Sequence, residues 1–389
     1  MRILFSALQY PSDAYPFAAF ISMMAKEMVK RGHSVTVICP QSITHQLIRR
    51  TPFLPEYEEF KVEGCSDIIK VYRPKSLTFG SRKYLGRVTT YINRFVASRC
   101  LKKFGCRFDV VYAHFWEAAY NVAKVVQEWK LPLNVACGED KIILPQLLKS
   151  KEVALLNKIT NNVIAVSSKN MRESVKHGLI DEVRCHVIPN GPDLRLFHQY
   201  DKDESRREFG FDKNDFIVAF VGRFIHRKGA KRVEEAVLKL NDTAVKAIFI
   251  GSTMADEDST QDPSGNEIIF KGVMPHHNIP RLLSAADVYV LPTLAEGCSN
   301  SIVEAMACGL PIVSSDRDFN YDVLDFSNAI LVNPLSIDEI AMAIKKLKDD
   351  ENLRIAMSES SLAKAAELSF EKRVDKILGI VESSISSYK

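Results

Sequence analysis

Two carboxylates in the last third of the chain, Glu296 and Glu304, lie eight positions apart on either side of a turn. Glu304 falls in an Ala- and Met-rich run that has a helical pattern and stops at Gly309. The first amides of such a helix have no partner in a preceding turn, and they lie at the positive end of the helix dipole, so they can hold a diphosphate. The carboxylates can accept hydrogen bonds from hydroxyls, and a nucleotide sugar offers both groups. The turn residues expected to bind it are Gly297, Cys298, Ser299, Asn300 and Ser301.

The same residues also fit a purely structural interpretation. Ser301 and Glu304 match a capping box, in which Glu304 would bond a backbone donor of its own helix. A helix capped at Ser301 would contain only residues 302–308, about two turns. A start near Ser299 gives a longer helix and leaves Glu304 to face a ligand, so we favour that start.

This segment resembles the Glu-x7-Glu signature of the family 4 retaining glycosyltransferases. Three further segments resemble parts of the family pattern in the same order: VIPNGPDLRLF (187–197), VGRFIHRKGAKRVEEA (221–236) and ADVYVLPTLAEG (286–297). The match covers roughly residues 160–320, and the amino-terminal half matches more loosely. The resemblance implies the GT-B architecture, which consists of two Rossmann-like domains facing a central cleft.

The resemblance also implies roles for individual residues. Arg223 and Lys228 would bind the donor diphosphate, Glu304 would accept from the ribose hydroxyls, and Glu296 would accept from hydroxyls of the donor sugar. Gly222 permits close backbone approach beside them, and Asn190 belongs to the family's interdomain segment. The family implies front-face transfer, in which the leaving phosphate takes the acceptor's proton. Because two cations and a helix terminus can stabilise the diphosphate, we expect no metal and no cofactor besides the nucleotide sugar as co-substrate.

The hydrophobic pattern predicts the elements that position these residues. Continuous apolar runs, typical of buried parallel strands, alternate with helical patterns in both halves of the chain. The alternation restarts after a breaker cluster at residues 189–192. We therefore predict an α/β protein with two doubly wound domains, an acceptor-side domain of residues 1–190 plus about 370–389 and a donor-binding domain of residues 191–369. The predicted strands are 3–8, 34–40, 108–114, 131–137 and 161–168, then 216–222, 246–252, 267–272, 287–292 and 310–315.

The amino-terminal half departs from the family pattern where the acceptor is expected. The loop at residues 9–20 contains no glycine, although many relatives have a Gly-rich loop there. A Cys-Gly-Glu-Asp sequence at 137–140 stands where many have His-Gly-x-Asp. Glu139 and His114, each at the carboxyl end of a predicted strand, are the substitutes that we consider for acceptor contact or catalysis. A core imidazole is an equally good interpretation of His114.

Size and composition suit a two-domain enzyme. The chain has 389 residues and no uncharged apolar run of 18 or more, and its start turns polar too soon for a signal peptide. We therefore expect a cytoplasmic protein. Its eight cysteines lack zinc-site spacing, so we expect no metal among them. An Asp-x-Asp motif at residues 256–258 has a metal-binding interpretation, but a surface loop fits it better.

Charge is unevenly distributed along the chain. Residues 73–107 contain ten Lys or Arg and no Asp or Glu, in a chain whose net charge is +4. Within this stretch an apolar set recurs at helical spacing: Tyr84, Leu85, Val88, Tyr91, Ile92, Phe95 and Val96. The pattern indicates a helix that contacts an anionic membrane surface or a lipid-linked phosphate acceptor, with peripheral attachment to the inner face of the cell membrane. A core-facing helix with a solvated basic back is the alternative.

The sequence thus predicts a metal-independent glycosyltransferase that moves a hexose-type unit to a glycan or lipid-linked acceptor in surface polysaccharide synthesis, with no nucleic acid partner. Two alternatives remain open, a non-catalytic nucleotide-sugar-binding assembly protein and a nucleotide-sugar 2-epimerase. An oxidoreductase is disfavoured because no Gly-x-Gly-x-x-Gly follows the first strand of either half.

Overall fold

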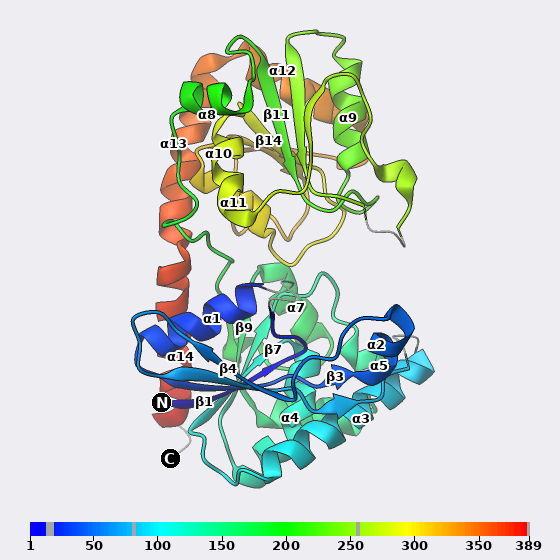
Figure 1. Ribbon diagram of the computed structural model, residues 1–389, viewed down its shortest axis with the longest axis vertical. Coiled ribbons are helices and arrows are strands. Elements are labelled where there is room, and N and C mark those ends of the chain that lie inside the picture. The colour runs from blue at the N-terminus through cyan, green and yellow to red at the C-terminus, as the bar shows by residue number, and fades with distance from the viewer. Residues whose placement is uncertain (13–18, 80–82, 254–256, 387–389) are drawn as a thin grey trace. The chain divides into compact units, whose positions relative to one another are not determined.

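The computed structural model describes residues 1–12, 19–79, 83–253 and 257–386. The chain forms two compact units, unit 1 (Met1–Ile188 with Val374–Lys389) and unit 2 (Pro189–Arg373). Each unit is built on a parallel sheet with helices on both faces (Figure 1), so the predicted α/β doubly wound class is confirmed.

Unit 1 contains an eight-stranded sheet in the order β10-β9-β8-β7-β1-β2-β5-β4. Neighbouring strands are parallel except for the β4–β5 pair, which is antiparallel. Its strands are β1 (Arg2–Ala7), β2 (Ser34–Ile38), β4 (Tyr57–Lys61), β5 (Ile68–Tyr72), β7 (Val110–His114), β8 (Leu133–Cys137), β9 (Thr160–Ala165) and β10 (Cys185–Val187), with β3 (Gln41–Ser42) and β6 (Lys75–Ser76) as a separate pair.

The helices of unit 1 cover both faces of this sheet (Figure 1). They are α1 (Ala19–Lys30), α2 (Ile43–Arg49), α3 (Lys83–Lys102), α4 (Trp116–Trp129), α5 (Leu144–Leu147), α6 (Ser150–Ile159), α7 (Ser168–Lys176), the 3-10 turn η1 (Glu182–Arg184) and α14 (Phe370–Ser386). From Val374 onward α14 belongs to unit 1, where Ser384 accepts a hydrogen bond from Asn134 of β8 at 3.0 Å. The end of the chain therefore completes the amino-terminal unit.

Unit 2 contains a six-stranded, fully parallel sheet in the order β13-β12-β11-β14-β15-β16. The strands are β11 (Phe216–Val221), β12 (Val245–Ile250), β13 (Ile268–Gly272), β14 (Val288–Leu291), β15 (Ile312–Ser315) and β16 (Ala329–Val332). The helices are α8 (Lys202–Phe209), α9 (Ala230–Lys239), α10 (Ile279–Ser284), α11 (Asn300–Ala307), α12 (Ile337–Asp349) and α13 (Glu351–Leu368), with 3-10 turns η2 (Ser259–Gln261) and η3 (His276–Asn278).

The strand order of unit 2 is the one typical of Rossmann folds, in which the first and fourth strands lie side by side at the sheet centre. The connections that follow these two strands lead to opposite faces of the sheet, so a crevice opens between them at the carboxyl ends of the strands. In unit 2 the two strands are β11 and β14. The chain after each of them carries residues that the sequence predicts to bind the donor.

All ten predicted strands are present, within one to three residues at each end. Most of their apolar runs are buried on both faces, and all five residues of β8 are buried, whereas β13 at the sheet edge is only partly buried. The prediction missed β3, β4, β5, β6, β10 and β16. Strands β4 and β5 alternate in burial, and the other four contain only two to four residues.

Part of the basic stretch forms α3, and the residues of its apolar set differ in burial. Four of the seven residues are exposed, among them Tyr84 at 80% and Phe95 at 65%, together with Leu85 and Val88. The buried face instead consists of smaller or polar residues such as Thr90, Asn93 and Ala97. The four exposed residues form an apolar strip on α3, and contact of this strip with a membrane stays a prediction.

An almost fully buried ion pair connects α8 to the central strands of the unit 2 sheet. Asp287, just before β14, accepts from the Arg206 guanidinium of α8 at 2.7 Å and from the backbone amide of Ile217 in β11 at 2.6 Å. Lys202 contacts the same carboxylate. Asp287 thus joins α8 to the two central strands.

Replacing Asp287 with Ala should lower the stability of unit 2 by about 3–5 kcal/mol, because Arg206 would be left as a buried charge without its partner. Both tryptophans lie in unit 1, so the change is best followed by calorimetry. An Asp349→Ala control removes an exposed partner of Lys345 and should change stability by about 0–1 kcal/mol. Equal effects of the two substitutions would contradict this assignment.

Candidate active site

The helix that follows β14 begins where the sequence analysis favours. Ser299 is the N-cap of α11, its side chain makes no capping hydrogen bond, and Asn300 is the first helical residue. Ser301 does not form a capping box with Glu304, because the Tyr289 hydroxyl donates to the Ser301 hydroxyl at 2.8 Å. Like any α-helix, α11 leaves its first amides without a partner in a preceding turn. They remain available as donors for an anion.

Glu296 is held by several donors at the switch point. Its Oε1 accepts from the Lys228 ammonium at 2.5 Å, from the Thr293 hydroxyl at 2.9 Å and from the Arg227 guanidinium at 3.4 Å. Lys228 stands in the turn between β11 and α9, and Glu296 stands in the turn between β14 and α11. The structure therefore brings together the two predicted residues that follow the central strands.

A glycine makes the turn before α9 feasible. Gly229 is the N-cap of α9 and has φ +84°, a conformation that other residues rarely adopt. A Cβ atom at this position would lie 2.9 Å from the Pro292 carbonyl oxygen and 2.6 Å from an Arg232 nitrogen. Arg232 in turn donates to the carbonyl oxygens of His226 and Pro292 at 2.8 and 2.9 Å. The turn that carries Lys228 is thereby fastened to the end of β14.

Glu304 lies in α11 with a partner that the sequence analysis missed. His276, in the turn after β13, approaches the Glu304 carboxylate at 3.3 Å. Burial raises the pKa of Glu304, although His276 opposes the shift. The hydrogen bond to Glu304 raises the pKa of His276. The only sequence signal for His276 is its place a few residues after a predicted strand of the same sheet.

Other predicted donor-site residues have structural contacts of their own. Arg223 follows β11 and Gly222 and forms an ion pair with Glu257. Asn190 donates to the Cys298 carbonyl oxygen at 3.0 Å, so it positions the turn before α11 rather than pointing away from it. Burial raises the pKa of the Cys298 thiol to about 12, which makes it a poor nucleophile.

The Asp-x-Asp motif does not gather ligands in the described part of the chain. Asp256 lies outside the described residues, Glu257 pairs with Arg223, and Asp258 caps η2 by accepting from the Thr260 amide at 3.0 Å. Among the residues that the structure describes, no group of three or more His, Cys, Asp or Glu side chains could hold a metal ion.

In unit 1, the predicted acceptor-side residues lie at the carboxyl ends of β7 and β8. Glu139 accepts from the amides of Trp116 and Gly138 at 3.1 and 3.0 Å, and burial raises its pKa. It lines a cavity of about 350 Å³. His114 is half-buried against Phe20 and Phe115 and is not among the residues that line this cavity.

Sequence reasoning also missed Glu117, in the first turn of α4. Its side chain lines the same cavity as Glu139 and a second, adjoining one of about 340 Å³. Burial raises the pKa of Glu117, and no hydrogen bond or ion pair joins it to any residue within the described ranges. A carboxyl group in that setting can exchange hydrogen bonds with a bound hydroxyl. The two cavities share Leu8, Thr78, Thr89 and Glu117.

Comparisons with known proteins agree on the family. The model of the family described as "Glycosyl transferases group 1" matches residues 201–363, and that of "Glycosyltransferase Family 4" matches residues 18–196. The chain is 29% identical over 369 residues to the putative teichuronic acid biosynthesis glycosyltransferase TuaC of Bacillus subtilis, covering 90% of each protein.

Two further proteins are similar. The Escherichia coli UDP-Gal:alpha-D-GlcNAc-diphosphoundecaprenol alpha-1,3-galactosyltransferase is 30% identical over 233 residues, 57% of this chain and 59% of that enzyme. The crystal structure of Anabaena Alr3699/HepE in complex with UDP and glucose has a TM-score of 0.71 at 21% identity, over 99% of this chain and 100% of that one. With both family models matched along its length and two Rossmann-like units of the GT-B type, this chain belongs to the group 1, family 4 glycosyltransferases.

Proposed function

We propose that this protein is a retaining, metal-independent glycosyltransferase that moves a hexose-type unit from a nucleoside diphosphate sugar to a glycan or lipid-linked acceptor in surface polysaccharide synthesis. One observation carries the proposal: the amino end of α11 lies between Glu296, which is bonded to Lys228, and Glu304 at the switch point of the unit 2 sheet. A diphosphate needs donors and positive charge, and a sugar and a ribose need hydroxyl acceptors. This site contains both.

In the proposed complex the diphosphate binds the α11 amides, Lys228 and Arg223. Arg223 is half-exposed beside Glu257, so its guanidinium can exchange that partner for a phosphate oxygen. Glu304 accepts from the ribose and Glu296 from the donor sugar. The turn residues Gly297 to Ser301, together with Gly222 and Asn190, shape the pocket around these groups.

In the proposed reaction, an acceptor hydroxyl forms its bond to the anomeric carbon on the face from which the diphosphate leaves. The bond between that carbon and the phosphate oxygen breaks, and the acceptor's proton passes to the departing oxygen. No protein nucleophile is required. Lys228, Arg223 and the helix terminus stabilise the negative charge that develops on the diphosphate, which is why we propose transfer without a divalent metal.

We assign the donor to the domain of residues 191–369 and the acceptor to the domain of residues 1–190 with about 370–389. Glu117 and Glu139 are the acceptor-side carboxyls that line a cavity, and His114 is a further candidate from its place at the end of β7. The names of the relatives favour a uridine nucleotide as the first donor to test and a polysaccharide or lipid-linked saccharide as acceptor.

Peripheral membrane attachment through α3 is the second part of the proposal. No helix among the described residues is long and apolar enough to cross a membrane. The exposed apolar strip of α3 could instead enter the headgroup region, with Arg99 exposed on the same helix. Several Lys and Arg residues of the stretch 73–107 form ion pairs, for example Lys75 with Glu56 and Lys102 with Glu128. The electrostatic attraction to an anionic membrane is therefore weaker than the number of positive charges predicts. Arg82 and the side chain of Lys83 lie outside the described residues.

Lys228→Ala should lower kcat by about 10²–10³-fold, because a cation at the leaving group is lost. Glu304→Gln should weaken UDP binding by about 10–100-fold, the range for a lost hydrogen bond to a charged group. Purified variants would be assayed for transfer or donor hydrolysis and, by calorimetry, for UDP binding. Lys239→Ala, which removes an exposed cation of α9, is the matched control. Wild-type activity in both site variants would refute the site assignment. If the wild-type protein binds UDP but neither transfers nor hydrolyses a donor, a non-catalytic binding protein is favoured.

Glu117→Gln should raise the melting temperature at pH 8, and the gain should vanish near pH 4. The folded-state pKa of Glu117 is raised by burial, so the unfolded chain ionises first and folding loses stability as the pH rises through that range. Each kcal/mol recovered is worth about 2–4 °C for a unit of this size. Glu128→Gln, at an exposed position of the same helix, should show no such gain. A gain independent of pH would show that charge burial is not the cause.

Replacing Tyr84 and Phe95 with Ser should reduce binding to vesicles that contain phosphatidylglycerol, because both rings are exposed on α3. Sedimentation with vesicles should show a loss of about tenfold or more, since each ring buries a large apolar area. Tyr321→Ser and Phe326→Ser, at exposed positions of unit 2, are the control pair. Unchanged sedimentation of the α3 variant would exclude attachment through this helix.

A further inference from the structure

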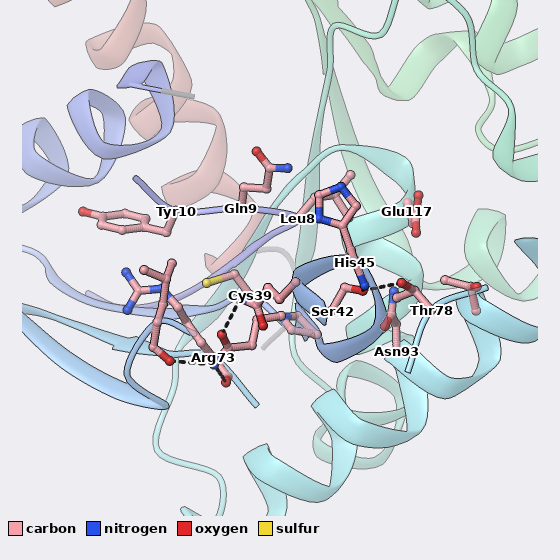
Figure 2. A pocket seen from close by; sticks show the side chains of 15 residues that line it. Leu8, Gln9, Tyr10, Cys39, Ser42, His45, Arg73, Thr78, Asn93 and Glu117 are labelled. Carbon is pink, nitrogen blue, oxygen red and sulfur yellow. Dashed lines mark hydrogen bonds between the residues drawn. The ribbon is translucent and has the colours of Figure 1, made fainter. Parts of the chain in front are cut away.

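The cavity of about 340 Å³ in unit 1 has a feature that a simple acceptor pocket does not need. It lies at the carboxyl ends of β1, β2 and β5, and we call it the Arg73 cavity after the buried guanidinium in its wall. Figure 2 shows Tyr10, Cys39 and Arg73 along one side and His45, Thr78 and Asn93 along the other. The rest of its lining consists mainly of apolar, hydroxyl and amide groups, together with His45 and the Glu117 carboxyl group.

Arg73 has one edge of its guanidinium unused. The residue is 1% exposed, and its Nη1 donates to Glu58 at 2.6 Å. Nε and Nη2 are buried and have no hydrogen-bond partner among the described residues. These two nitrogens form the side-on fork that binds a pair of carboxylate or phosphate oxygens with two parallel hydrogen bonds. Because a buried charged donor without an acceptor is costly, the fork itself points to an anionic ligand group.

Two other polar atoms in residues that line the cavity are also buried without satisfying their hydrogen-bonding capacity within the described residues. The Tyr10 hydroxyl and the Gln46 Oε1 are buried and find no partner in the described part of the chain, in residues that are 4% and 9% exposed. The amide of Gln46 is oriented by its neighbours, since its Nε2 donates to Gln41 Oε1 at 3.0 Å and Gln41 Nε2 donates to the Arg73 carbonyl at 2.9 Å. The wall thus offers a charged fork, a hydroxyl and an amide acceptor.

These groups match an acidic sugar better than a free anion. A saccharide can place its charged oxygens on Arg73, donate a hydroxyl to Gln46 and pack its carbon faces against Leu8 and Leu54, which also line the cavity. The atoms of the fork are shielded from solvent, so binding a ligand to them requires a side-chain rotation at the wall.

We propose that the Arg73 cavity binds a saccharide acceptor through a carboxylate or phosphate group on that saccharide, and that Arg73 selects acidic over neutral acceptors. The inference rests on the proposed function, because it specifies the acceptor of the same enzyme. It makes Arg73, Tyr10 and Gln46 specificity residues, not catalytic ones.

The test is a thermal-shift and calorimetric titration of the full chain with glucuronate, glucose 6-phosphate, inorganic phosphate and glucose, all in saturating UDP so that the donor site is occupied. Glucuronate or the sugar phosphate should give a saturable shift, and glucose should bind about tenfold or more weakly. A thermal shift with glucuronate would identify a carboxylate as the ligand group, and a shift with glucose 6-phosphate would identify a phosphate. Equal responses to glucose and the acidic sugars, or a response to inorganic phosphate alone, would overturn the proposal.

Two variants and one control complete the test. Arg73→Lys keeps the charge but lacks the fork, so acidic-sugar binding should fall by about tenfold or more. Tyr10→Phe should weaken it by about two- to tenfold while leaving the melting temperature of the unliganded protein unchanged or higher, since the hydroxyl has no partner. Arg99→Lys, exposed on α3, should bind like the wild type. Unchanged binding in both cavity variants overturns the assignment. If UDP alone does not raise the melting temperature of the wild-type protein, that result counts against the proposed function and not against the Arg73 cavity.

Discussion

One ion pair, Lys228 with Glu296, joins the two connections on which the proposed donor site of unit 2 depends. Lys228 follows the first strand of the Rossmann order and Glu296 follows the fourth, so the pair spans the place where the strand order reverses. Further bonds reinforce the same junction, including that from the Leu294 amide to the Arg227 carbonyl at 2.8 Å. The amino end of α11 is therefore positioned by contacts that exist without a ligand, which is the preorganisation that electrostatic catalysis needs.

The two glutamates of the signature have the same chemistry but different surroundings. Glu296 accepts from two cations and a hydroxyl, so it also fixes the position of Lys228. Glu304 faces a single histidine, and its pKa is raised by burial. Replacing Glu296 would remove the carboxylate that holds Lys228 in place. Replacing Glu304 would remove a hydrogen-bond acceptor whose pKa depends on His276. Spacing alone does not distinguish these roles.

The sequence was sufficient for the parts of the molecule that local chemistry determines. Continuous apolar runs predicted the parallel strands, and the preference for Ser299 over Ser301 as the start of α11 is confirmed, since Ser299 is the N-cap and the helix runs from Asn300 to Ala307. The sequence was insufficient where partners come from distant segments. His276, Glu117 and the Asn190 contact to Cys298 depend on which chain segments the topology places together. The apolar residues of α3 show the same limit, since helical spacing could not tell which of them another helix would cover.

The cavities of unit 1 show why the acceptor is hard to read from sequence. In the proposed function, unit 2 recognises groups that every nucleotide sugar shares, so helix termini, lysines and carboxylates can recur there at fixed spacing. An acceptor varies from enzyme to enzyme, and the proposed acceptor site is assembled from single residues after β1, β2, β5, β7 and β8. In the sequence, Arg73 is one of ten cations in a basic stretch. In the structure it is buried, and one edge of its guanidinium has no partner among the described residues. In the proposed acceptor site, burial is what makes Arg73 a specific recognition group, because a buried cation carries a desolvation cost that an anionic ligand can relieve.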